Sequence, residues 1–124
     1  MLVFKNKAFA KWAEKEGLTD AALLGAVVEI DLGLVDADLG GQVFKKRVAV
    51  NGRGKSGGVR TLVAYRVGDK AFFVYGFAKN ARANISDKEL KALKLYANVL
   101  LTYSEAELRQ AIISGALIEV INNG

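Results

Sequence analysis

The sequence predicts an α+β domain in which two N-terminal helices pack on a small, twisted, mostly antiparallel sheet, with further helices near the C-terminus. Three observations lead to this fold class. Apolar residues recur at helical spacing within residues 6–32, β-branched and aromatic residues fill two runs between residues 59 and 77, and capping-box sequences begin at Ser86 and Ser104. A chain of 124 residues, 52% hydrophobic, fits one compact domain.

The first 32 residues predict a short strand followed by a helical hairpin. Residues 1–4 are apolar enough for the strand, and Asn6 can cap a helix that runs to about residue 16. Gly17 ends this helix, because glycine readily adopts the left-handed conformation of a helix terminus. Thr19 or Asp20 can cap the second helix, which runs to about residue 32.

The middle of the chain predicts three strands separated by glycine-containing loops. We expect a loop over residues 33–41, a strand over 42–50, a loop over 51–58 and a β-hairpin over 59–77. Gly68–Asp69 fits a two-residue hairpin turn of type II′ or I′.

The hairpin is expected to have one mixed face and one apolar face. With Val67 opposite Lys70, the predicted cross-strand pairs on the mixed face are Arg60 with Phe77, Leu62 with Tyr75, and Ala64 with Phe73. Lys79 and Arg66 extend this face, part of which should meet solvent or a ligand. The other face, which includes Phe72 and Val74, should pack against helices.

The C-terminal third predicts two helices and a strand-like tail. Ser86 and Ser104 each precede an acidic residue at the third helical position, so they cap helices that run to about residue 101 and to Gly115. The apolar tail over residues 116–121 either packs as a final strand or binds a partner.

Positive charge is concentrated in the middle of the chain. Residues 39–86 hold ten Lys or Arg and one acidic residue, whereas the rest holds eight basic and twelve acidic residues. Such a field attracts polyanions. Within it, Arg53, Lys55 and Arg60 stand close together without a nearby acid, which indicates that an anion completes the site; a solvated basic surface is the alternative.

The glycine-rich segment GRGKS is not a nucleotide-triphosphate loop. That motif requires a glycine where this chain has Ala49, and a helix after the serine, whereas Val59 begins a predicted strand. Cysteine and histidine are absent, which excludes thiol chemistry and removes the commonest general base. We expect no metal, no cofactor and no membrane span, and a soluble cytoplasmic protein.

Residues 52–93 resemble a known family. The segments GRGKSGGVR, VAYRVGDKAFFVYGFAKN and RANISDKELKALK look like the RelE/HigB toxins of bacterial toxin–antitoxin modules. The resemblance covers roughly residues 1–101 of a single domain over residues 1–124, and residues 102–124 are a less diagnostic extension. It implies ribosome-dependent cleavage of mRNA in the A site, and a cognate antitoxin of the helix-turn-helix type.

The same resemblance assigns roles to basic residues of this chain. The basic residues that match the family are Arg53, Lys55, Arg60, Lys79 and Arg82, and of these we expect Lys55, Arg60, Lys79 and Arg82 to be catalytic. Separately from the match, we expect Arg53, Lys46 and Phe77 to contact RNA. Some relatives carry a tyrosine near the start of the final helix, where this chain has Ser86 and Asp87, so the general acid and base stay open. Packing in the sheet is an equal alternative for Phe77.

RNA cleavage suits these residue types, because RNA supplies its own nucleophile, the 2′-hydroxyl. The enzyme must align the attack, move two protons and stabilise the more negative phosphorane. Arginine binds phosphate oxygens in pairs, and lysine crowded by like charges can transfer protons. A non-catalytic RNA- or ribosome-binding module and a gyrase-inhibiting toxin of the ParE type remain the alternatives.

Overall fold

The computed structural model describes residues 1–50, 54–78 and 85–121, with the backbone alone over residues 54–57. In chain order, the elements are β1 (Leu2–Asn6), α1 (Lys7–Glu16), α2 (Asp20–Asp31), β2 (Ala37–Asp38), β3 (Val43–Val50), β4 (Gly54–Arg66), β5 (Lys70–Ala78), α3 (Asp87–Leu101), α4 (Glu105–Ser114) and β6 (Leu117–Glu119).

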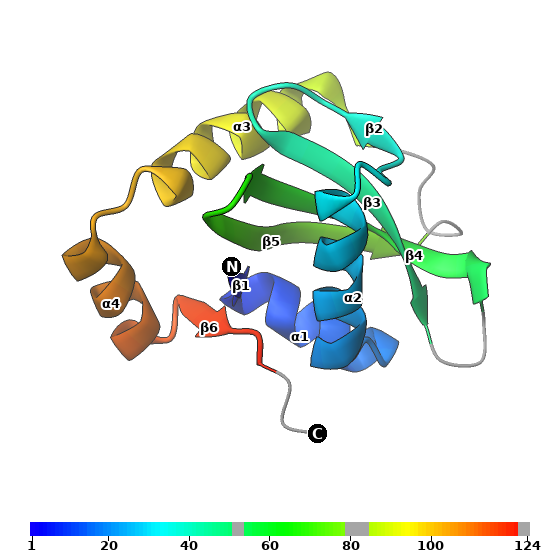
Figure 1. Cartoon of the computed structure of the whole chain (residues 1–124), viewed down its shortest axis with the longest axis horizontal. Coiled ribbons are helices and arrows are strands. Elements are labelled where there is room, and N and C mark those ends of the chain that lie inside the picture. The colour runs from blue at the N-terminus through cyan, green and yellow to red at the C-terminus, as the bar shows by residue number, and fades with distance from the viewer. Residues whose placement is uncertain (51–53, 79–84, 122–124) are drawn as a thin grey trace.

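A six-stranded mixed sheet forms the centre of the domain, in the order β2-β3-β4-β5-β1-β6. All neighbouring strands are antiparallel except β1 and β5, which are parallel. Helices α1 and α2 cover one face, and α3 lies across the other (Figure 1). This arrangement confirms the predicted α+β class with an N-terminal helical hairpin and C-terminal helices.

The helix boundaries follow from the capping residues that the sequence predicts. The Asn6 side chain accepts a hydrogen bond from the Phe9 N–H, and Thr19 rather than Asp20 caps α2. Ser86 and Ser104 form complete capping boxes. Gly17 has a φ of 77°, the left-handed conformation that ends α1.

Each face of the sheet carries its own apolar core. The core under α1 and α2 includes Phe9, Leu23, Val63 and Phe73, and the core under α3 and α4 includes Phe4, Leu62, Phe72 and Leu100. Trp12 of α1 lies directly over Gly76 of β5, where a Cβ atom would stand 2.1 Å from the indole ring. Trp12 is therefore part of the packing on this face of the sheet.

The predicted hairpin register is correct near Arg60 and wrong near the turn. Arg60 lies opposite Phe77 and Leu62 opposite Tyr75, but the register then shifts, so that Arg66 faces Lys70. The turn consequently has three residues, 67–69, instead of two. The cause is a β-bulge at Val74, which is an extra residue on β5. Because of the bulge, the side chains of the residues before Val74 point to the opposite face of the sheet from the predicted one. Phe72 and Val74 thus join Leu62 under α3, contrary to the prediction.

Three further segments can be compared with the sequence prediction: residues 33–41, the start of β4 and the C-terminal tail. The expected loop over 33–41 contains the edge strand β2, which pairs with β3, and β4 begins at Gly54 inside the expected loop 51–58. The C-terminal tail packs internally, because β6 pairs with β1. Among the described residues, no helix combines the length and apolar character needed to cross a membrane.

Candidate functional site

Three side chains of the candidate site form a row across neighbouring strands. Arg47 of β3 lies opposite Arg60 of β4, and Arg60 lies opposite Phe77 of β5. Residues paired in this way share a face of the sheet, and here it is the face that also carries Leu62 and α3. The row therefore lies on the same face as the second core, which contains none of its three residues.

Arg60 is the most buried cation of this row, with 12% of its side chain exposed. Its Nη1 atom is buried and has no hydrogen-bond partner among the residues that the structure describes. A buried, charged donor without a partner is costly, and such groups are concentrated at functional sites. The unpartnered donor favours an anion at Arg60, and the exposed part of the side chain is where an anion would approach.

A carboxylate stands beside both arginines, which corrects the expectation that Arg60 has no acid nearby. Asp36 Oδ2 lies 3.5 Å from Arg47 Nε and 4.0 Å from Arg60 Nε. Asp36 reaches this place because its backbone N–H binds the Lys45 carbonyl at 2.9 Å, next to the pairing of β2 with β3. Two guanidinium groups share one carboxylate, so a net positive charge remains for a phosphate group.

Phe77 is in the predicted row but is only 4% exposed, and its ring packs against Tyr75 with 6.1 Å between centroids. A ring this buried has no open face on which a base could stack. The packing interpretation of Phe77 is the better supported one, and we leave Phe77 out of the RNA contacts proposed below.

Lys46 lies on the opposite face, away from the row. Its side chain is 5% exposed, and its ammonium group contacts Glu29 of α2 at 2.6 Å and the Leu34 carbonyl at 2.8 Å. Alternation along β3 explains this, because Lys46 falls between Phe44 and Val48 on the face under α2. An ammonium group engaged in this way is not available to RNA, so Lys46 also drops out of the expected RNA contacts.

Replacing Lys46 with methionine is expected to lower the free energy of unfolding by about 1–3 kcal/mol, because Glu29 and the Leu34 carbonyl lose their shared partner. Methionine keeps most of the apolar stem in place. Urea denaturation measures the change, with Lys91→Met on the exposed side of α3 as the matched control. Equal midpoints for the two variants would show that the internal ion pair contributes nothing.

The remaining predicted residues fall outside what the structure describes. Arg53, Lys79 and Arg82 lie outside the described residues, and Lys55 belongs to β4 at a position where only the backbone is described. The structure does describe the strand pairing next to these residues. Val50 pairs with Gly54, and Val59 pairs with Ala78, the residue before Lys79. The catalytic and RNA-binding roles expected for Arg53, Lys55, Lys79 and Arg82 remain predictions.

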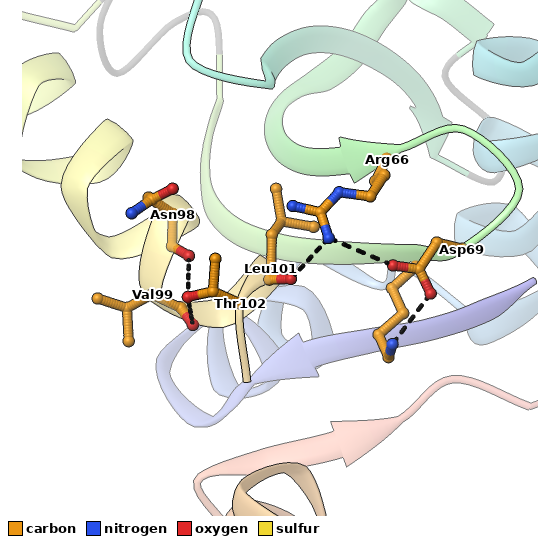
Figure 2. Close-up of polar contacts among 7 residues, drawn as sticks. Arg66, Asp69, Asn98, Val99, Leu101 and Thr102 are labelled. Atoms are coloured by element: carbon orange, nitrogen blue, oxygen red, sulfur yellow. Dashed lines mark hydrogen bonds and ion pairs between the residues drawn. The ribbon is translucent and has the colours of Figure 1, made fainter. Parts of the chain in front are cut away.

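Arg66, at the other end of β4, has a structural role (Figure 2). Its Nη1 donates a hydrogen bond to the Leu101 carbonyl at 2.9 Å and lies 3.6 Å from Asp69. The carbonyl belongs to the last residue of α3, where a cation offsets the negative end of the helix dipole. Arg66 thus fastens the hairpin turn to α3.

Tyr65 fastens β4 to α2 on the opposite face through a hydrogen bond from its hydroxyl to Asp31. Burial, then that hydrogen bond and the charge of Asp31, raise the pKa of Tyr65 from 10.0 to about 12. Folding therefore favours the neutral phenol. The stability that this preference provides is fully present below pH 10 and is lost as the pH rises towards 12.

Replacing Tyr65 with phenylalanine is expected to cost about 1 kcal/mol of stability at pH 7, because one buried hydrogen bond is lost. The variant should also lack the component of alkaline destabilisation that the wild type shows between pH 10 and about 12. Denaturant titrations of both proteins across this range provide the measurement. Parallel curves would show that Tyr65 does not titrate in this way.

Sequence reasoning missed two members of the site, Arg47 and Asp36. The sequence does contain a signal for Arg47. Side chains alternate along residues 42–50, so Arg47 lies on the face of that strand that is not apolar. Its position beside Arg60 depends on how β3 pairs with β4, which the residues alone did not determine. Asp36 had no signal, because it lies within residues 33–41, a segment that the sequence predicts to be a loop.

Comparison with protein families identifies the family of this chain. A family model described as the RelE toxin of the RelE/RelB toxin–antitoxin system matches residues 1–120. No curated protein is similar enough to count as a match. The match covers all the described strands and helices, including the row that contains Arg47 and Arg60.

Proposed function

The chain belongs to the RelE toxin family of RelE/RelB toxin–antitoxin systems, and from this premise we propose that it is a ribosome-dependent endoribonuclease that cuts mRNA in the A site. The observation that carries the proposal is the buried Arg60 guanidinium, whose Nη1 has no hydrogen-bond partner within residues 1–50, 58–78 and 85–121. Arg47, directly opposite it on β3, provides a second cation on the same face.

The chemistry follows from the charge that develops during cleavage. The 2′-hydroxyl attacks the adjacent phosphate, and the resulting phosphorane carries more negative charge than the substrate. Arg60 can bind two of its oxygens, since guanidinium donors match phosphate geometry. Lys55 or Lys79 would transfer the protons, Arg82 would share the phosphorane charge, and Arg53 would hold the RNA backbone.

Family membership also implies a RelB-type antitoxin as partner. We propose that this antitoxin is a helix-turn-helix protein that neutralises the toxin by covering the basic face, and that the toxin acts on ribosomes in the cytoplasm. A non-catalytic ribosome-binding module would need the same basic face without the proton transfers. A ParE-type gyrase inhibitor would need neither RNA nor ribosomes.

A pair of assays separates these functions. Purified protein is added to a reconstituted translation reaction and, in parallel, to a gyrase supercoiling reaction. We expect translation to stop with fragmented mRNA while supercoiling continues. Arrest with intact mRNA would favour the binding module, and stalled supercoiling with normal translation would favour the gyrase inhibitor.

A further inference from the structure

We propose that Asp36 is a positioning residue for the RNA chemistry, because its carboxylate orients the guanidinium groups of Arg60 and Arg47 towards the scissile phosphate. This inference rests on the proposed function for its reaction, but the orientation of Arg60 can be measured without it. Asp36 itself touches neither the phosphate nor the 2′-hydroxyl in this account.

The first support is the geometry around the Asp36 carboxylate. One oxygen, Oδ2, lies 3.5 Å from Arg47 Nε and 4.0 Å from Arg60 Nε. The carboxylate thus stands on the Nε side of both guanidinium groups. The Nη1 atom of Arg60, which has no hydrogen-bond partner in the described part of the chain, is left for another acceptor.

The second support is the pairing of two like charges. Arg47 and Arg60 are directly opposite on antiparallel strands, where like-charged residues repel and destabilise the sheet. Arginine side chains are long and have many rotamers, so repulsion alone would drive the two groups apart. A shared carboxylate, 20% exposed, offsets the repulsion and favours the rotamers in which both groups stay close.

The third support is the way in which Asp36 is held. Its backbone N–H binds the Lys45 carbonyl at 2.9 Å, and the next two residues form β2 against β3. The carboxylate is therefore anchored to the same strand that carries Arg47. A positioning group needs such a rigid base, because small displacements of a reacting group have large effects on rate.

The Asp36→Asn variant separates two explanations for the carboxylate. A charge effect would change RNA binding, whereas a positioning effect would change kcat. Removing an acid from a basic face should leave RNA binding unchanged or tighten it, by up to about fivefold. If Asp36 orients Arg60, kcat should nevertheless fall, by about 10²-fold. We therefore expect KM to hold or fall while kcat falls, and Asp36→Glu to recover part of the loss.

The matched control is Asp38→Asn, which removes the same charge two residues further along the chain, in the edge strand β2. Asp38 accepts a hydrogen bond from the Gly40 N–H at 3.0 Å, and the amide oxygen of asparagine can replace that acceptor. The control should keep wild-type kcat. Thermal melting of all variants establishes that they are folded.

A second readout is independent of cleavage. The Nε–H resonance of Arg60, assigned by its absence in Arg60→Lys, reports the order of the side chain by NMR relaxation. We expect an ordered signal in the wild type and in Asp38→Asn, and a disordered one in Asp36→Asn. An ordered Arg60 in Asp36→Asn, or a disordered one with unchanged kcat, would overturn the inference.

The same experiment distinguishes failure of the proposed function from failure of this inference. If the wild type cuts no ribosome-bound mRNA, the proposed function is overturned. Loss of Arg60 order in Asp36→Asn would still support Asp36 as the residue that orients Arg60.

Discussion

Arg60→Ala is expected to lower the rate constant for mRNA cleavage on ribosomes by about 10²–10³-fold, because the transition state loses its buried guanidinium donors. Arg60 is the best placed of the described cations for this task. It lies in the centre of the row, with 12% of its side chain exposed and one donor atom that has no partner among the described residues. Single-turnover cleavage of a ribosome-bound mRNA gives the rate constant directly.

The matched control is Arg109→Ala, the same substitution on the exposed side of α4. It should cleave at the wild-type rate. Arg60→Lys keeps the charge but cannot bind two phosphate oxygens at once, so it should recover only a small part of the activity. If Arg60→Ala cut as fast as the control, Arg60 would have no part in the chemistry.

Gly58→Ala is expected to cause a large loss of stability, about 2–4 kcal/mol. A Cβ atom on Gly58 would stand 2.2 Å from the Val48 carbonyl oxygen and 3.2 Å from the Ala49 Cα atom. Both neighbours are backbone, so no side chain can rotate away and the strands themselves must move. The register between β3 and β4 shifts at this point, between Val48 and Val50.

Gly25→Ala is the control for this substitution. Gly25 lies within α2 with no atom within 4 Å of the added methyl group. Alanine is the better helix former, so this variant should be more stable than the wild type by up to about 1 kcal/mol. Urea midpoints of the two variants should therefore move in opposite directions. A Gly58→Ala midpoint at or above the wild-type value would show that the two strands do not approach this closely.

Much of the fold could be predicted because its signals are local. The caps at Asn6, Ser86 and Ser104 are short sequence patterns, and the structure contains all three. The bulge at Val74 could not be predicted in this way. The position of the bulge decides in which of the two cores Phe72 and Val74 are buried. Both cores are apolar, so the residue types do not distinguish between them.

The candidate site was less predictable, because it depends on pairing between distant segments. For Lys46, the sequence contained enough information to indicate burial. Alternation places it between Phe44 and Val48 on the apolar face, where a buried lysine needs a partner. Its partner, Glu29, lies on a helix and could not be identified from sequence spacing. The same holds for Asp36, which meets Arg60 only through the pairing of β2, β3 and β4.

Primer extension on a defined mRNA tests the central claim most directly. Ribosomes stalled with an empty A site are incubated with purified wild-type protein, and the mRNA is then copied from a labelled primer. We expect shortened products that end within the A-site codon and that are absent when ribosomes are omitted. Full-length product alone, at protein in excess over ribosomes, would contradict the central claim.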